Sequence, residues 1–206
     1  LAARHHVVVL SDEIHCDLTD PGWDYTPFAA ASAECRANSI TCLAPTKAFN
    51  LAGLQTSAVS VPDPALRHKV WRALNTDEVA EPNCFAAEAA VAAFTKGAPW
   101  LDALRAYLAE NKAVARAFIS RELPAVRAVV SHGTYLLWLD CSALTADGGE
   151  LARFLRAQTG LRLSAGGVYR GNGGAFLRMN LACPRARLQD GLERLKRGVE
   201  AFAAQA

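Results

Sequence analysis

Three short, mostly apolar runs in the first third of the chain constrain its fold more than any other feature. They occupy residues 7–10, 39–43 and 56–61, carry many β-branched side chains, and are followed by proline or polar residues. Runs of this length are typical of parallel strands that are covered on both faces. The sequence therefore predicts three buried strands belonging to the end of a larger α/β sheet.

An acid and an amine follow two of these runs. Asp12 comes soon after the first run and Lys47 soon after the second. Ligands collect at the carboxyl ends of strands in open α/β sheets. Pyridoxal phosphate needs such a pair, a lysine for the Schiff base and a carboxylate facing the pyridine nitrogen. Each residue also has a plainer interpretation: Asp12 as the cap of a turn, Lys47 as a solvated side chain, and His15 as an ordinary, partly buried histidine.

The rest of the chain reads as helices followed by a compact α+β pattern. Helices are predicted over residues 64–74, 83–96 (capped by Asn83) and 100–123, and then over 150–158 and 186–202. Strands are predicted over residues 126–130, 135–139, 161–163 and 176–181. We expect residues 1–98 to be the remnant of a large α/β domain, and residues 99–206 to form a linking helix and a small α+β domain.

One charged residue lies inside a predicted apolar strand. Arg178 is costly there unless its charge is paired. An internal salt bridge is one explanation, and a bidentate clamp on a substrate carboxylate is the other. The glycine-rich residues 166–174 lack the strand–loop–helix context of a phosphate-binding loop.

Composition excludes several classes of function. The 22 basic and 20 acidic residues form no basic block, so we expect no nucleic-acid partner. The apolar runs are far shorter than the roughly 20 residues of a membrane span. Six scattered cysteines without a C-x-x-C pair favour buried free thiols in a reducing, cytoplasmic compartment rather than a metal site.

Four ordered sequence blocks carry a family resemblance. The chain resembles the carboxyl-terminal half of the fold-type I pyridoxal-phosphate enzymes of the class I/II aminotransferase group. Within that group it is most similar to the MalY/PatB branch of cystathionine β-lyases (C–S lyases). The matching blocks are residues 11–17, 45–53, 133–141 and 176–185. We accordingly expect the first half of the parent protein to be missing.

The resemblance implies a role for each candidate residue. Lys47 binds the cofactor and later shuttles protons, and Asp12 keeps the pyridine nitrogen protonated. His15 lies near the 3-hydroxyl, Thr46 near the phosphate, and Arg178 holds the α-carboxylate of the amino-acid substrate. The implied reaction is β-elimination from an S-substituted cysteine such as cystathionine, which yields a thiol, pyruvate and ammonia. Family enzymes are usually homodimers with the cofactor at the subunit interface.

The chain also departs from the family pattern. A serine and an arginine that bind the phosphate are replaced by Ala44 and Gln55, and the chain has Tyr169-Arg170-Gly171 where a phenylalanine-glycine pair is expected. With these contacts and the first half missing, we expect weak or absent cofactor binding by these 206 residues. Two alternatives stay open: an aminotransferase, and a cofactor-binding regulatory or interaction module without catalysis.

Overall fold

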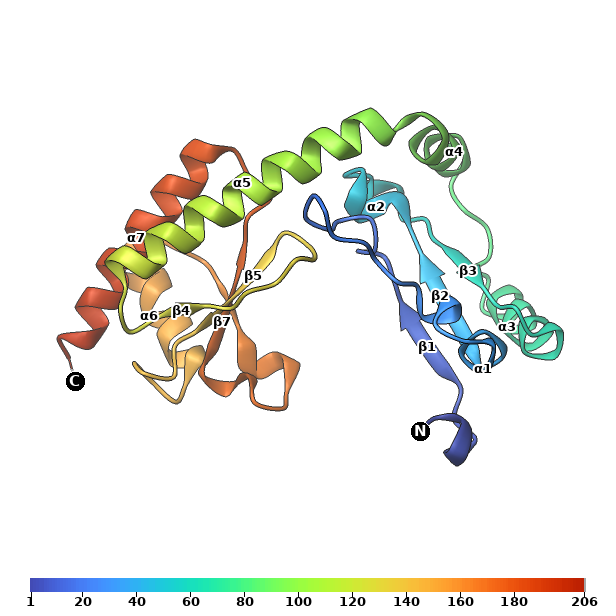
Figure 1. Ribbon diagram of the computed structural model, residues 1–206, viewed down its shortest axis with the longest axis horizontal. Helices are drawn as coiled ribbons and strands as arrows, with labels where there is room; N and C mark the ends of the chain where they lie inside the picture. The colour runs from blue at the N-terminus through green and yellow to red at the C-terminus, as the bar shows by residue number, and fades with distance from the viewer. Residues whose placement is uncertain (206) are drawn as a thin grey trace. The chain divides into compact units, whose positions relative to one another are not determined.

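The structure of the protein is a computed structural model that describes residues 1–205. The chain forms two compact units (Figure 1). The first unit runs from Leu1 to Arg105, and the second begins at Ala106. Helix α5, Ala98–Glu122, starts in the first unit and continues in the second. The expected domain division between residues 98 and 99 falls at the start of this helix, and as a statement about domains it stays a prediction.

A three-stranded sheet forms the centre of the first unit. It contains β1 (Val9–Asp12), β2 (Ser39–Leu43) and β3 (Ala58–Ser60), in the order β1-β2-β3. Strands β1 and β2 are parallel, whereas β3 runs antiparallel to β2. The α/β class predicted from the sequence is confirmed.

The prediction that all three strands are buried is wrong. Leu10 in β1 is 64% exposed, and every residue of β3 is exposed. Strand β1 is paired only with β2, and the described residues supply little chain to cover the sheet. Burial is instead concentrated in the central strand, at Ser39 and Thr41.

Four α-helices accompany this sheet. Helix α3 begins at Pro64 because Asp63 caps it, its Oδ1 accepting a hydrogen bond of 2.7 Å from the Leu66 amide. The expected cap at Asn83 is wrong, because its side chain accepts from the Phe85 amide in a turn that precedes the helix. The helix bounds are α1 Ala33–Ala37, α2 Pro45–Ala48, α3 Pro64–Thr76 and α4 Ala86–Lys96.

The second unit is built on a four-stranded antiparallel sheet. Its order is β4-β5-β7-β6. The strand predicted at 161–163 is wrong, because the chain pairs with β7 only after Leu163. The bounds are β4 Arg127–Ala128, β5 Leu136–Asp140, β6 Ser164–Ala165 and β7 Phe176–Asn180.

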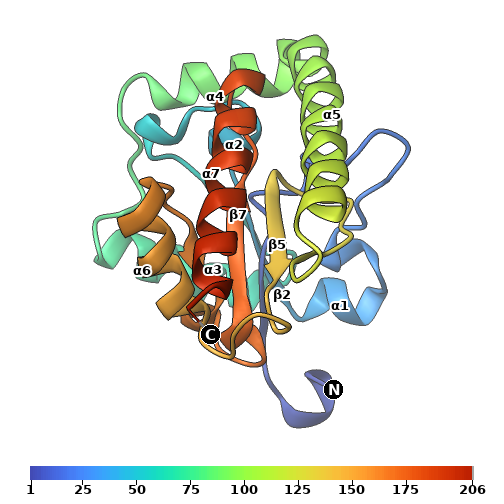
Figure 2. The same ribbon diagram turned by 90° about the vertical axis from the view of Figure 1, so that its left-hand side faces the viewer.

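Three helices cover one face of this second sheet. Figure 2 shows α7 (Arg185–Ala203) crossing in front of β7, with α5 and α6 (Gly148–Thr159) on either side. Alternate strand residues point toward the helices, so Leu137 and Leu139 of β5 and Leu177 of β7 are buried. The helices complete this core with side chains that include Ala115, Ile119, Leu151, Leu155, Leu188, Leu192 and Leu195.

Helices α6 and α7 approach each other closely at one glycine. A Cβ atom added at Gly198 would lie 2.3 Å from Cδ2 of the fully buried Leu155. The hydrogen atom of glycine is what allows this contact. None of the described helices combines the length and apolarity that a bilayer crossing requires.

Candidate functional site

Asp12 is the last residue of β1, and it begins a tight turn. Its exposed carboxylate accepts a hydrogen bond of 3.3 Å from the Ile14 amide. Asp12 pairs in register with Cys42 of β2. Burial is the main cause that raises the pKa of the Cys42 thiol, and the negative charge of Asp12 raises it further. The carboxylate is thus placed beside the carboxyl end of the neighbouring strand.

The turn after Asp12 is held by a buried acid that the sequence interpretation missed. Glu13 is 3% exposed, and its Oε1 accepts from Ser11 Oγ at 2.8 Å and from the Phe28 amide at 2.9 Å. Its amide also donates to the Cys42 carbonyl at 2.9 Å. Glu13 therefore fixes the backbone on both sides of Asp12. The available signal was an acid next to an apolar run, a position in which a charge needs partners.

Lys47 lies on α2, a single helical turn that starts two residues after β2 ends. Pro45 occupies its first position, and Ala48 is fully buried beneath it. The lysine itself is half-buried, as is the neighbouring Thr46. The rigid proline start and the buried alanine hold the lysine in a fixed position relative to β2.

Phe49 anchors the segment that follows Lys47. Its ring stacks on Trp100 with a centroid distance of 5.9 Å and meets Phe94 edge-on at 6.0 Å. Gly97 leaves space for the ring, since an added Cβ there would lie 2.5 Å from Phe49 Cε1. This aromatic cluster fixes the far end of the turn that carries the amine.

The first unit therefore brings four of the five candidate residues to one edge of its sheet. Asp12 ends β1, and half-buried His15 lies in the turn beyond it. Thr46 and Lys47 follow β2, the parallel neighbour of β1. Carboxyl ends of adjacent parallel strands lie at the same edge, which is where such sheets bind ligands. The arrangement offers an anionic, a hydroxyl, an imidazole and an amine group at that edge.

Two positions near Lys47 in the sequence do not carry the polar groups expected from the resemblance. Ala44 is buried, with 6% exposure, and has no side-chain donor. Gln55 is exposed and has a left-handed backbone, with φ of 49°, where it ends a short 3-10 helix, Ala52–Leu54. Neither residue supplies a cation at this edge.

Arg178 belongs to the second unit, on the face of the sheet opposite the helices. It pairs with Trp138 of β5 and with Ser164 of β6. Its guanidinium lies 4.7 Å from the centroid of the Tyr169 ring, and that ring meets Trp138 edge-on at 5.3 Å. A cation over an aromatic face is stabilised without a carboxylate partner. This contact explains how the strand accommodates the charge.

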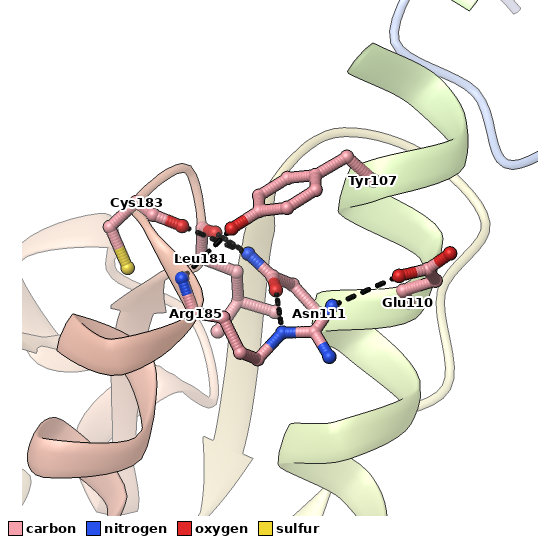
Figure 3. A network of polar contacts seen from close by, with 6 residues as sticks. All are labelled: Tyr107, Glu110, Asn111, Leu181, Cys183 and Arg185. Carbon is pink, nitrogen blue, oxygen red and sulfur yellow. Dashed lines mark hydrogen bonds and ion pairs between the residues drawn. The ribbon is translucent and has the colours of Figure 1, made fainter. Parts of the chain in front are cut away.

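A polar network fixes the chain just beyond β7. The amide of fully buried Asn111 on α5 donates to the Leu181 carbonyl at 2.9 Å and to the Cys183 carbonyl at 3.1 Å (Figure 3). Arg185 donates to Asn111 Oδ1 at 2.7 Å and forms an ion pair with Glu110 at 3.2 Å. The network ties the end of the strand that carries Arg178 to a long helix.

The cysteines are all free thiols, but they are less buried than expected. Cys141 is buried, Cys84 is exposed, and the other four are half-buried. Burial, followed by the charge of Asp140, raises the pKa of Cys141 to about 12. Within residues 1–205, no group of three or more histidine, cysteine or acidic side chains is placed to bind a metal ion.

The sequence of this chain is similar to one protein family and to several curated proteins. The family described as Aminotransferase class I and II matches residues 1–195. Cystathionine beta-lyase PatB of Bacillus subtilis is 43% identical over 196 residues, which are 95% of this chain and 51% of PatB. Protein MalY of Escherichia coli is 32% identical, with 98% of this chain and 51% of MalY covered. The chain thus spans about half the length of the curated relatives it matches.

A solved structure has the same fold. The PLP-bound putative aminotransferase from Clostridium difficile superposes with a TM-score of 0.92 at 36% sequence identity. The match covers 96% of this chain and 51% of that protein. The fold of this chain therefore has a close counterpart in an experimental structure.

Proposed function

This chain belongs to the aminotransferase class I and II family, and on that basis we propose that it is part of a pyridoxal-phosphate-dependent C–S β-lyase. The proposed reaction cleaves an S-substituted cysteine, such as cystathionine, into a thiol, pyruvate and ammonia. The placement of Asp12 and Lys47 at one sheet edge is the observation that carries the proposal. The 43% sequence identity between this chain and Cystathionine beta-lyase PatB favours this reaction over others in the family.

The residues at the sheet edge fit the proposed cofactor. Its reactive carbonyl needs an amine that is accessible, and Lys47 is half-exposed. Its ring nitrogen needs an anionic neighbour, which the exposed Asp12 carboxylate supplies. Thr46 offers a hydroxyl to the phosphate, and His15 offers an imidazole to the 3-hydroxyl. When bound, the cofactor supplies an electron sink for the charge that develops at the substrate α-carbon.

Each of these residues has a defined task in the proposed reaction. The Lys47 amine would remove the α-proton of the substrate. The Asp12 carboxylate holds a proton on the ring nitrogen and so favours charge flow away from the substrate. Loss of the β-thiolate then gives aminoacrylate, which hydrolyses to pyruvate and ammonia. Arg178 holds the α-carboxylate with its planar guanidinium, a geometry suited to bidentate binding.

An aminotransferase is the second candidate. It would share proton removal by Lys47, but it would transfer the amino group of the substrate and expel no β-group. The 36% identity to a putative aminotransferase of known structure favours keeping this candidate.

Product analysis on the full-length, cofactor-loaded protein separates the two. A lyase releases pyruvate and free thiol from cystathionine in equal amounts. Pyridoxamine phosphate that accumulates without thiol release would reject the lyase and support the aminotransferase. Lys47→Ala should lower the rate by a factor on the order of 10²–10⁴. Lys96→Ala, which alters an exposed lysine on α4, is the matched control.

We further propose that the full-length protein is a cytoplasmic homodimer. The six free cysteines fit a reducing compartment, and enzymes of this group usually bind their cofactor between two subunits. Light scattering coupled to gel filtration should give twice the subunit mass. A monomer that retains lyase activity would contradict the proposed assembly.

A further inference from the structure

Arg170 has a backbone conformation that is unusual for an arginine. It ends the 3-10 helix η4, Gly166–Tyr169, with φ of 62° and ψ of −161°. This region of backbone space is essentially restricted to glycine, because a Cβ atom is strained there. A glycine would adopt the same conformation without strain.

The conformation is imposed by the closure of the loop. An added Cβ at Gly166 would lie 2.5 Å from the Gly173 carbonyl oxygen, and one at Gly173 would lie 2.5 Å from the Gly166 oxygen. Between these contacts, the Arg170 amide donates to Gly167 at 3.1 Å and its carbonyl accepts from Gly173 at 3.2 Å. The backbone path is therefore set by its neighbours. Because glycine would fit this backbone with less strain, the exposed side chain of Arg170 is the feature that needs an explanation.

The Arg170 side chain belongs to the same loop as Tyr169, which contacts Arg178. Arg170 directly follows Tyr169, whose ring lies 4.7 Å from the Arg178 guanidinium. Arg170 is exposed, so its guanidinium is available to a ligand in solution. Arg170 is thus the chain neighbour of the tyrosine whose ring contacts Arg178.

The surrounding sequence is basic and lacks acids. No aspartate or glutamate occurs between Glu150 and Asp190, whereas the same segment contains seven arginines. One of them, Arg185, is already bound to Asn111 and Glu110. A segment of one charge sign raises the local concentration of oppositely charged ligands. The seven are Arg153, Arg156, Arg162, Arg170, Arg178, Arg185 and Arg187.

We propose that Arg170 is a specificity-determining residue that binds a second carboxylate of the substrate, located beyond the β-sulfur. The inference rests on the proposed lyase function, in which Arg178 holds the α-carboxylate. A guanidinium binds a carboxylate through two parallel hydrogen bonds, which an uncharged group cannot reproduce. The preferred substrates are therefore cysteine thioethers with an anionic distal end, a class that includes cystathionine.

A matched pair of substrates tests the role of the charge. S-(2-carboxyethyl)-L-cysteine and its amide, S-(2-carbamoylethyl)-L-cysteine, have nearly the same shape and differ in distal charge. In the full-length, cofactor-loaded protein, we expect KM to be about tenfold lower for the acid than for the amide. Arg170→Gln should bring this ratio close to one, and Arg170→Lys should retain part of it. Arg156→Gln, at an exposed arginine of α6, should keep the full ratio.

Thermal unfolding tests the backbone argument independently of activity. Arg170→Gly should unfold at a temperature equal to or above that of Arg170→Gln, because glycine fits the loop without strain. A lower unfolding temperature for the glycine variant would show that a side chain at position 170 supports the fold, and would overturn the inference.

The possible failures are distinguishable. Thiol release with equal KM for acid and amide, or with a ratio that survives Arg170→Gln, leaves the lyase standing and overturns the role of Arg170. If neither compound releases thiol, the lyase proposal fails, and calorimetric affinities of the same two compounds replace KM. A preference for the acid that disappears in Arg170→Gln then supports the inference, whereas equal affinities or no binding overturn it.

Discussion

Asp12 and Cys42 lie side by side on two parallel strands, and after burial the Asp12 carboxylate is the second cause that raises the pKa of the Cys42 thiol. This pairing ties the position of the proposed cofactor-binding acid to the strand that leads into Lys47. The acid and the amine are therefore positioned by the same two-stranded unit rather than by independent loops.

Neutralising the Asp12 charge tests its proposed role. In the full-length, cofactor-loaded protein, Asp12→Asn should lower the rate of pyruvate formation by a factor on the order of 10²–10³, because an amide does not hold a proton on the ring nitrogen. Cys42→Ala alters the paired residue without removing that charge and should retain most of the activity. An Asp12→Asn variant as active as the parent would contradict the assignment.

Asn111 should contribute strongly to the stability of the second unit. Asn111→Leu preserves approximate size but leaves the Leu181 and Cys183 carbonyls and the Arg185 guanidinium without this partner. Because buried unpaired polar groups are costly, we expect the free energy of unfolding to fall by about 2–4 kcal/mol. Glu110→Gln, which weakens only the exposed ion pair of the network, should cost less than ~1 kcal/mol. Urea denaturation measures both, and equal effects would contradict the buried role of Asn111.

Two glycines of α7 should respond to alanine in opposite directions. Gly191→Ala places a Cβ 3.6 Å from Met179 Cε, an ordinary contact, and should stabilise the helix by about 0.5–1 kcal/mol. Gly198→Ala places a Cβ 2.3 Å from Leu155 Cδ2 and should destabilise the unit by about 1–3 kcal/mol through overpacking. Thermal or urea unfolding of the two variants gives the sign directly. Stabilisation by both would show that Leu155 has room to move.

The ion pair between Arg127 and Asp140 should make stability depend on acid pH. Arg127 Nη2 lies 2.7 Å from Asp140 Oδ2, and hydrogen bonds from Arg127 and Ser142 lower the pKa of Asp140 to about 2. Since the unfolded carboxyl titrates near ~3.9, the folded state gains stability above that pH and loses it as the pH falls toward 2.

Arg127→Gln should raise the pKa of Asp140 in an NMR titration. It should also lower the free energy of unfolding at pH 6 by less than ~1 kcal/mol, because Arg127 is largely exposed and water screens the pair. The difference between variant and parent should vanish only well below pH 2, once the carboxyl is protonated in both. An unchanged Asp140 titration in the variant would show that Ser142 alone sets this pKa.

Local sequence signals predicted the elements that such signals control. The strand at residues 39–43 has its predicted bounds because Pro45 stops it, and α3 starts at Pro64 as expected. The grouping of Asp12 with Lys47 also follows from local reasoning, since Asp12 ends β1, Lys47 follows β2, and these strands pair in parallel. The start of α4 was misjudged because the Asn83 side chain has two local uses, a helix cap and a turn.

Features that depend on contacts distant in sequence were not predictable in the same way. Glu13 is buried because Phe28 and Ser11 supply its hydrogen bonds, and no spacing rule connects these residues. Arg178 is accommodated by Tyr169 because the intervening loop closes through Gly166 and Gly173. The exposure of β1 and β3 depends on what covers the sheet, which a strand pattern does not report.

The outer side of β1 has a practical consequence for work with these 206 residues alone. In the part of the chain that is described, its main-chain amides and carbonyls on that side face no other strand, and Leu10 adds an exposed apolar group. An unpaired edge strand is a template on which strands of further copies of the chain can pair. Concentrated samples should therefore precipitate or assemble into fibrils. A lysine in place of Leu10 should keep the preparation dispersed, because charge repulsion opposes stacking of successive copies.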